Sequence, residues 1–219
     1  MILLLLLQIG FHQNRANLVP APCSAAEPHV VLTYGDSKTV PVAGLPDALN
    51  EFPWQLDLID NSHCHINHAQ LNVIATAGIR TSQRKTLIDA ELAAATYTPR
   101  AILYNLGSND AYYSEAEAGD EATWKTNVAY IWDAMHAKWP SAQIWYSETW
   151  RQGYDAESDR MAVWYAELAV GRDYIHLCDN ERSWVKGSDD GATMFWDGVH
   201  FSYAGVAEKA RRAAACLGY

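Results

Sequence analysis

One serine, one aspartate and one histidine have the residue types and spacing that ester hydrolysis requires. Ser37 lies in the tripeptide GDS, directly after the apolar run HVVLTY, and Asp197 and His200 stand three residues apart in WDGVHFS. A serine hydroxyl is a weak nucleophile unless an imidazole removes its proton, and a carboxylate fixes the tautomer of that imidazole. The three-residue step brings the two side chains to one side of a turn. We predict Ser37 as the nucleophile, His200 as the base and Asp197 as the group that orients it.

The same chemistry needs hydrogen-bond donors for the oxyanion of the tetrahedral intermediate. Gly78 ends the segment QLNVIATAG, and Asn109 lies in the segment GSND. We expect the backbone N–H groups of Ser37 and Gly78, together with the Asn109 amide, to supply these donors. Asp110 is expected to be structural.

Each of these short segments has a simpler interpretation. An Asp-Ser pair often forms a turn that caps a helix, and Asn-Asp pairs also favour turns. A backbone carbonyl instead of Asp197 would also orient His200, which would leave a Ser-His dyad. The positions of the segments in the fold distinguish these alternatives.

Short apolar runs alternate with longer amphipathic stretches along the chain, which is typical of βαβ units and a parallel sheet. The run at 29–34 is continuous and β-branched, as in a strand buried on both faces. The expected strands cover 29–34, 70–78, 101–107, 142–149 and 173–179, and the expected helices cover 84–97, 121–139, 157–171 and 202–218, with weaker helical spacing at 46–60. We predict an α/β protein with about five parallel strands in a three-layer α/β/α sandwich.

This architecture brings the chemistry-bearing segments together. Ligands of open α/β sheets bind outside the carboxyl ends of the strands. GDS, Gly78 and GSND each follow an expected strand, and WDGVHFS ends the long loop before the last helix. We therefore expect all four segments at one edge of the sheet.

The charge balance of the 219-residue chain argues against a nucleic-acid partner. Twenty-six acidic residues against sixteen basic ones give a formal charge of −10, and no run of Lys or Arg is present. A groove that follows a phosphate backbone needs clustered positive charge. No cofactor is expected.

Aromatic residues are frequent, with nine Trp and twelve Tyr, and serve either as core or as stacking surfaces for a substrate. The predicted substrate-contacting residues follow expected strands or lie in the last loop: Trp150, Arg151, Trp184 and Trp196. Lys38, next to the nucleophile, is expected at the mouth of the pocket.

The N-terminal residues 1–28 are expected to be separate from a single domain at 29–219. Their leucine run is too short to span a bilayer and lacks the basic start of a signal peptide, so it is either an atypical signal, an anchor or a packed strand. An extracellular location is slightly favoured. Cys23, Cys64, Cys178 and Cys216 have no C-x-x-C spacing and are either disulfides or buried thiols.

One further cluster, HCHINH at 63–68, contains residue types that bind divalent metals. It precedes an expected strand, at the edge of the sheet opposite to the serine. We interpret it as a surface loop and expect no metal.

The ordered set GDS, Gly78, GSND and WDGVHFS resembles the SGNH, or GDSL-type, hydrolase superfamily. The resemblance spans about residues 29–205 with all four blocks in family order, although Lys38 replaces the usual apolar residue. It implies a flavodoxin-like fold and metal-independent esterase or acylhydrolase activity. By the same matching, Ser37, His200 and Asp197 are the triad, and Ser37, Gly78 and Asn109 are the oxyanion donors.

The expected substrate follows from the loops at this edge, which contain few aliphatic residues. Aromatic surfaces suit acetylated sugars, whereas a long acyl chain needs an aliphatic groove. We therefore predict an esterase that removes O-acetyl groups from a small-molecule or glycan substrate. The alternatives are a general short-chain esterase or lysophospholipase, and a glycan-binding module without catalysis. Oligomeric state is not predicted.

Overall fold

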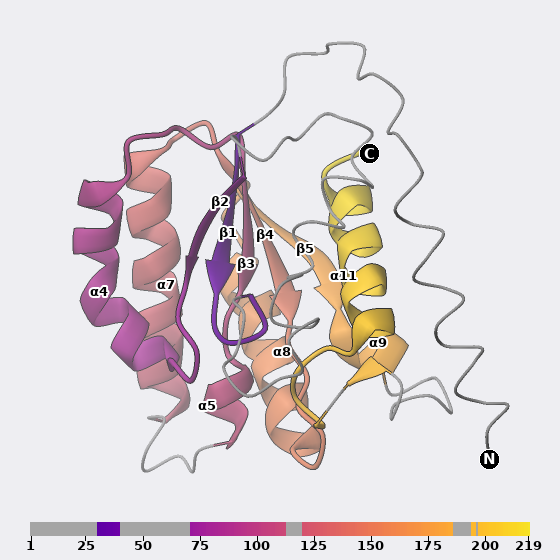
Figure 1. The fold of residues 1–219 in the computed structure, drawn as a ribbon. Helices are drawn as coiled ribbons and strands as arrows, with labels where there is room; N and C mark the ends of the chain where they lie inside the picture. The colour runs from indigo at the N-terminus through magenta and orange to yellow at the C-terminus, as the bar shows by residue number, and fades with distance from the viewer. Residues whose placement is uncertain (1–29, 40–70, 113–119, 186–193, 196) are drawn as a thin grey trace, which may run out of the picture.

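A five-stranded parallel sheet forms the centre of the molecule. A computed structural model of the chain describes residues 30–39, 71–112, 120–185, 194–195 and 197–219. The strands are β1 (Val31–Gly35), β2 (Leu71–Ala75), β3 (Ala101–Asn105), β4 (Gln143–Glu148) and β5 (Ile175–Asn180). Their order in the sheet is β2-β1-β3-β4-β5, and every pair is parallel (Figure 1). This confirms the predicted α/β class and the number of strands.

Helices cover both faces of the sheet. The described helices are α4 (Thr81–Ala94), α5 (Ser108–Tyr112), α7 (Glu121–Lys138), α8 (Asp155–Ala169), α9 (Glu181–Val185) and α11 (Tyr203–Cys216). One apolar core lies between the sheet and α4, α7 and α8, and a second lies under α9 and α11. Figure 1 shows α4 and α7 on one side of the sheet and α11 on the other, which is the expected three-layer sandwich.

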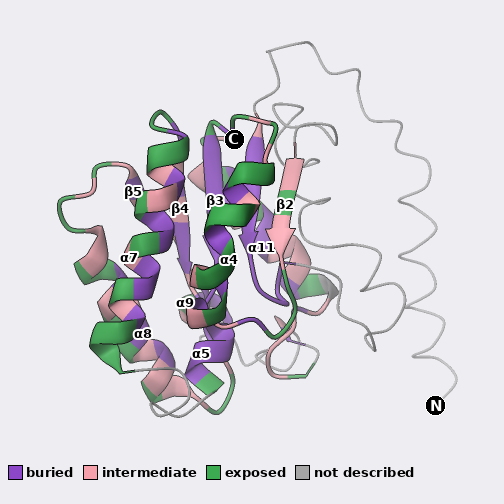
Figure 2. Ribbon diagram, turned by 90° about the vertical axis from the view of Figure 1, so that its left-hand side faces the viewer, coloured by how far each residue is buried: buried purple, intermediate pink, exposed green. Residues whose placement is uncertain are grey.

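The burial of the strands explains their sequences. The five residues of β1 and of β3 are all buried, whereas β2 lies at the edge and is mostly half-buried (Figure 2). Gly35 and Asn105 are register partners where these central strands end. A Cβ at Gly35 would lie 2.3 Å from the Asn105 carbonyl oxygen, so this close approach of the two backbones requires glycine.

Most helix boundaries agree with the sequence pattern. On α7 the predicted apolar face is buried, from Trp124 to Met135, and the helix ends at Lys138, before Pro140. Ser202 caps α11 as predicted, because its side chain accepts a hydrogen bond from the Gly205 N–H. In contrast, α4 begins at Thr81, three residues earlier than the prediction.

Two five-residue helices, α5 and α9, lie in segments that the sequence pattern assigned to loops. A helix of little more than one turn has no apolar periodicity to detect. α9 directly follows β5, and α5 begins three residues after the end of β3, so both lie at the edge of the sheet where β1 leads into Ser37.

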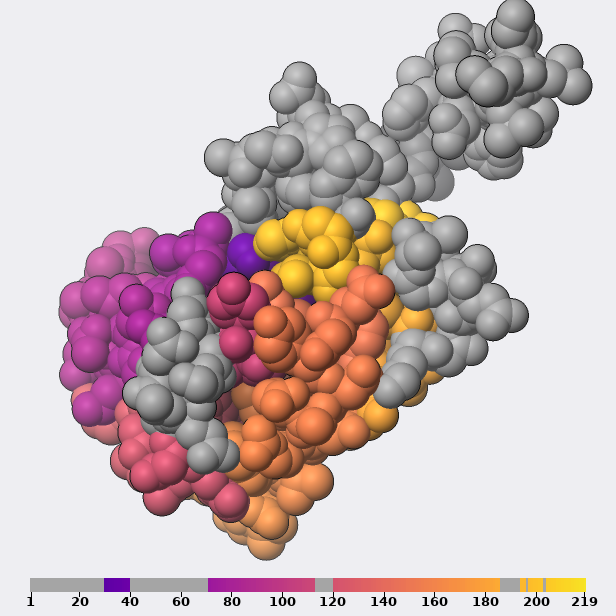
Figure 3. All heavy atoms as spheres, turned by 90° about the horizontal axis from the view of Figure 1, so that it is seen from below, coloured from indigo at the N-terminus to yellow at the C-terminus, as the bar shows by residue number. Residues whose placement is uncertain are grey.

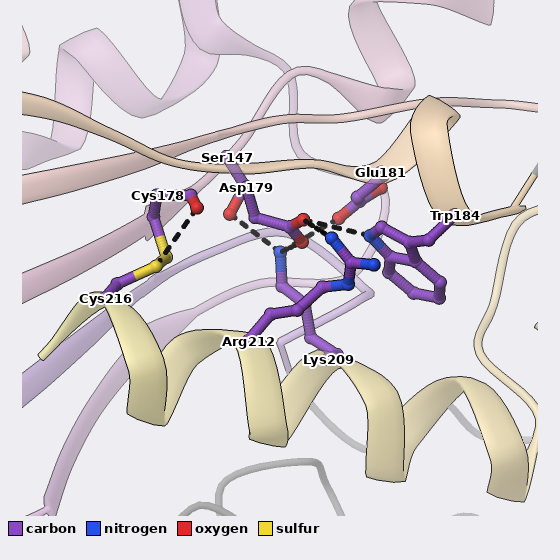
Figure 4. Close-up of a disulfide and its surroundings, with 8 residues drawn as sticks. All are labelled: Ser147, Cys178, Asp179, Glu181, Trp184, Lys209, Arg212 and Cys216. Carbon is purple, nitrogen blue, oxygen red and sulfur yellow. Dashed lines mark hydrogen bonds and ion pairs between the residues drawn. A yellow bond between two sulfur atoms is a disulfide. The ribbon is translucent and has the colours of Figure 1, made fainter. Parts of the chain in front are cut away.

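One disulfide, Cys178–Cys216, connects β5 to the end of α11 (Figure 4). Cys23 and Cys64 lie outside the described residues, as do the leucine run, the expected helix at 46–60 and HCHINH. None of the described helices has the length and apolar character needed to cross a bilayer.

Candidate active site

The three predicted catalytic side chains lie in one hydrogen-bonded row. Ser37 is in the turn that follows β1, and its Oγ is 3.0 Å from Nε2 of His200. Nδ1 of His200 is 2.7 Å from Oδ2 of Asp197. When Nδ1–H donates to this carboxylate, Nε2 is left to accept the proton of Ser37, as a general base requires.

The Asp197 carboxylate is held by its own loop. Its Oδ1 accepts hydrogen bonds from the backbone N–H groups of His200 (2.8 Å) and Val199 (3.0 Å). Partial burial alone would raise the pKa of Asp197, but these bonds and the His200 side chain outweigh burial and keep the pKa below its usual value. Asp197 therefore stays ionised beside the imidazole.

Asp36 fixes the turn that presents Ser37. Its Oδ1 accepts a hydrogen bond from the Lys38 N–H (3.0 Å), and its Oδ2 accepts one from the Ser108 hydroxyl at the start of α5 (2.6 Å). Burial raises the pKa of Asp36. The bond to Ser108 joins the end of β1 to the end of β3, where the strand order reverses and α/β sheets bind ligands.

One hydrogen bond connects the segments that carry two of the predicted oxyanion donors, Asn109 and Gly78. Asn109 is buried, and its Nδ2 donates to the Ile79 carbonyl at 3.1 Å, which connects α5 to the residue after Gly78. The second hydrogen of that amide group is not used by this bond. Gly78 is exposed and has a φ of +73°, a left-handed conformation that favours glycine independently of catalysis.

The segment after β4 packs against the histidine loop. The Gln152 N–H donates to the Gly198 carbonyl at 3.0 Å. Figure 3 views the molecule from below, where crimson, orange and yellow parts of the chain lie close to the indigo segment at 30–39. The sheet therefore brings three distant parts of the chain around one serine.

Comparison with models of protein families identifies the family of this chain. The model of the GDSL-like Lipase/Acylhydrolase family matches residues 33–207, which include every residue of the row. The chain belongs to this family. No curated protein sequence matches it.

Solved structures resemble this GDSL-like hydrolase in fold. Axe2, an acetylxylan esterase from Geobacillus stearothermophilus, has a TM-score of 0.68 at 13% identity, covering 87% of this chain and 94% of that one. The psychrotrophic esterase EstA from Pseudoalteromonas sp. has a TM-score of 0.63 at 18% identity, with coverages of 86% and 96%. A family two carbohydrate esterase from Clostridium thermocellum gives 0.66 at 17% identity, with coverages of 86% and 63%.

Lys38 is not at the pocket mouth of this GDSL-like hydrolase, contrary to the prediction. Its side chain is fully buried, and Nζ donates to Oε2 of Glu181 and to the Trp150 carbonyl, both at 2.6 Å. A buried ammonium group is tolerated where a carboxylate and a carbonyl replace its water. The lysine therefore anchors the serine turn from inside.

Glu181, the first residue of α9, has a second lysine partner. Its Oε1 is 3.2 Å from Nζ of Lys209 on α11, and Lys209 also contacts Asp179 (3.1 Å) and the Ser147 hydroxyl (2.7 Å). Figure 4 shows these side chains between β5 and α11. Burial alone would raise the pKa of Glu181, but the two lysines outweigh it and lower the pKa.

Sequence reasoning missed Glu181, although it directly follows β5 at the edge of the sheet where Ser37 lies. The sequence pattern places it in the long loop before the last helix. The rule that ligands bind outside the carboxyl ends of the strands, which selected the other site residues, also applies to Glu181.

Two of the predicted stacking tryptophans belong to the core. Trp150 and Trp184 are only 6% and 7% exposed. Their Nε1 groups donate to Asp155 and Asp179, and their rings stack on Phe195 and Phe201. Neither is available as a surface for a substrate. Trp196 lies outside the described residues.

Arg151 is the one described residue of that prediction with a partly exposed side chain. Its guanidinium lies over the rings of Tyr112 and Tyr154, which sequence reasoning did not select. Among the described residues, no group of three His, Cys, Asp or Glu side chains is arranged to hold a metal ion.

Asp110 should make stability depend on pH. Its buried carboxylate accepts hydrogen bonds from the N–H and hydroxyl of Thr81, the first residue of α4, at 3.0 to 3.2 Å. Burial outweighs these bonds and raises the pKa of Asp110 to about 7. Because the folded state then holds the proton more tightly than the unfolded state, this group stabilises the fold most below its ordinary pKa. Its contribution is lost as pH rises toward about 7.

The prediction is tested with Asp110→Asn, which removes the charge. Between pH 4.5 and 8, the wild type should lose on the order of 2–4 kcal/mol of unfolding free energy relative to this variant. Chemical denaturation at several pH values measures the difference. Asp120→Asn is the control, because Asp120 is an exposed helix cap whose pKa is lowered. Parallel stability curves for wild type and Asp110→Asn would contradict the prediction.

Proposed function

We propose that the protein is a serine esterase that removes small acyl groups, foremost O-acetyl groups, from carbohydrate. The observation that supports the chemistry is the row Ser37–His200–Asp197. The Ser37 Oγ lies 3.0 Å from His200 Nε2, and His200 Nδ1 lies 2.7 Å from Asp197 Oδ2. Both distances are within hydrogen-bond range. The family to which the chain belongs, named for lipases and acylhydrolases, supports the same reaction class.

In the proposed mechanism, Ser37 Oγ attacks the ester carbonyl while His200 Nε2 takes its proton. Asp197 keeps the imidazole oriented and stabilises its positive charge. The oxyanion accepts hydrogen bonds from the Ser37 and Gly78 N–H groups and from the free hydrogen of the Asn109 amide. His200 then protonates the leaving alcohol, which leaves an acyl group on Ser37. A water molecule, deprotonated by His200, hydrolyses this acyl-enzyme and releases the carboxylic acid.

A small acyl group suits the nucleophile's surroundings. Ser37 is only 6% exposed, so little space is available next to its hydroxyl for the acyl group of a bound ester. The described residues after β3 and β4 present Tyr112, Arg151 and Tyr154, whereas Leu106 is buried in the core. Aromatic and polar surfaces favour a sugar over a long acyl chain. Axe2 and the Clostridium thermocellum protein, both carbohydrate esterases, support the proposal as similar folds.

The test compares acetate release from acetylated xylo-oligosaccharides with hydrolysis of p-nitrophenyl esters of increasing chain length. We expect the highest kcat/KM on acetyl esters and a steep fall beyond about four carbons. A preference for acyl chains of about eight carbons or longer would favour the lysophospholipase alternative. Binding of acetylated oligosaccharide without hydrolysis of any ester would indicate a glycan-binding module.

A further inference from the structure

Arg151 is held in a fixed orientation by two tyrosines. Its guanidinium carbon lies 4.3 Å from the ring centroid of Tyr112 and 5.6 Å from that of Tyr154. The two rings themselves meet edge to face, with centroids 5.4 Å apart. Stacking of a guanidinium on aromatic rings orients it without using its N–H donors.

The two tyrosines and the arginine come from both sides of the site. Tyr112 is three residues after Asn109 on α5, so it lies one turn beyond the proposed oxyanion donor. Arg151 directly precedes Gln152, which bonds to the histidine loop at Gly198. The Arg151–Tyr112 contact therefore connects α5, which carries Asn109, to the segment after β4, which is bonded to the loop of His200.

The charge of Arg151 has no carboxylate partner within ion-pair distance among the described residues. Six of the eight other described arginines each contact at least one carboxylate: Arg84, Arg160, Arg172, Arg182, Arg211 and Arg212. Because the Arg151 guanidinium is partly exposed and stacks on two aromatic rings, its N–H donors can bind an anionic ligand.

We propose that Arg151 binds a carboxylate on the alcohol side of the ester, so that the preferred substrates are acetyl esters of sugars that contain a uronic acid. This rests on the proposed function and specifies its substrate class. The planar fork of a guanidinium fits a carboxylate with two parallel hydrogen bonds. Tyr112, which is 48% exposed, adds an apolar contact surface for the sugar ring.

A phosphate would satisfy the same fork, as in a phosphorylated sugar or a lysophospholipid. A lipid also needs an aliphatic groove, whereas the rings that the Arg151 guanidinium contacts are those of two tyrosines. The observations therefore favour the carboxylate of a sugar, and the phosphate becomes an outcome of the test.

The experiment compares three small acetyl esters: the O-acetylated methyl glycoside of a uronic acid, the corresponding uronamide, and acetylated glycerol phosphate. The uronate and uronamide differ only in charge. We expect wild-type protein to prefer the uronate by about tenfold in kcat/KM, because a charged hydrogen bond at a half-exposed site keeps part of its strength. This preference should shrink in 0.5 M salt.

Variants of Arg151 assign the preference to this side chain. In Arg151→Gln the uronate-to-uronamide ratio should fall to about one, and in Arg151→Lys it should fall partway, because the charge remains without the fork. Arg160→Gln is the matched control, since Arg160 is an exposed arginine on α8 that is paired with Glu157. It should keep the wild-type ratio.

Each other outcome is distinct. Equal hydrolysis of uronate and uronamide by wild-type protein overturns this inference and leaves the proposed function intact. Preference for the phosphate overturns the carboxylate assignment. Hydrolysis of p-nitrophenyl acetate without release of acetate from either sugar overturns both the sugar proposal and this inference.

Discussion

Ser37→Ala is expected to lower kcat for p-nitrophenyl acetate by about 10⁴- to 10⁶-fold, the range seen when a coupled nucleophile is removed. The alanine has no oxygen to form the acyl bond and no hydroxyl proton for His200 to accept. Residual activity would come from the proposed oxyanion donors acting on water. Because the three side chains act as a unit, a Ser37→Ala/His200→Ala double variant should be almost no slower than Ser37→Ala.

Labelling with a fluorophosphonate probe tests the same assignment independently of substrate choice. Wild-type protein should form one covalent adduct at Ser37, and Ser37→Ala should form none. Ser183→Ala is the control: Ser183 lies on α9, is exposed, and donates its hydroxyl only to a backbone carbonyl among the contacts described. Labelling of Ser37→Ala at the wild-type rate would implicate another serine, and failure of folded wild-type protein to react would indicate a binding module.

Breaking the buried ion pair of Lys38 is expected to affect both stability and reactivity. Lys38→Met leaves the fully buried Glu181 carboxylate with one lysine partner instead of two. Removal of one member of a buried pair costs about 3–5 kcal/mol of unfolding free energy. Since Lys38 is the neighbour of Ser37, loss of its anchor should also displace the nucleophile, and a misplacement of about 1 Å lowers rates by about 100-fold.

Lys209→Met separates these two effects. Lys209 contacts the same Glu181 carboxylate and is also buried, but it lies on α11, whereas Lys38 is the residue next to Ser37. We expect both variants to lose stability by similar amounts in chemical denaturation, while only Lys38→Met labels slowly with the fluorophosphonate. The rates are compared at a temperature where both proteins are folded. Equal labelling rates would show that the pair only stabilises the fold.

A double variant gives the converse result. Lys38→Met/Glu181→Leu replaces the pair by apolar side chains, and Asp179 remains as a partner of Lys209. Replacement of a whole buried pair by apolar residues is often neutral for stability. Stability should therefore recover partly, whereas labelling should stay slow because the serine turn has not regained its anchor.

Residues close together in sequence could be assigned from the sequence alone. The strands β1 and β3 were predictable because a strand buried on both faces has a continuous apolar sequence. The Asp197–His200 pair could be predicted because three residues of a turn suffice to bring the two side chains together. Ser37, Gly78 and Asn109 could be grouped because parallel strands all end at one edge.

Contacts between distant residues were decided only by the tertiary structure. The sequence placed Lys38 at the pocket mouth, because nothing near it shows that Glu181, 143 residues later, neutralises it in the interior. Trp150 and Trp184 follow β4 and β5 as expected, but the apolar layer under α9 and α11 buries them. Patterns over a few neighbouring residues of the sequence predict burial and turns. The partner of a buried charge depends instead on how separate helices and strands pack together.

The same distinction applies to the substrate. The sequence by itself determined the α/β class, the proposed nucleophile and the edge of the sheet where the chemistry would occur. The tertiary structure buries two of the tryptophans at that edge and places Arg151 against Tyr112, 39 positions earlier in the chain. That contact depends on α5 and the segment before α8 meeting at the ends of adjacent strands, and no local pattern specifies such a meeting.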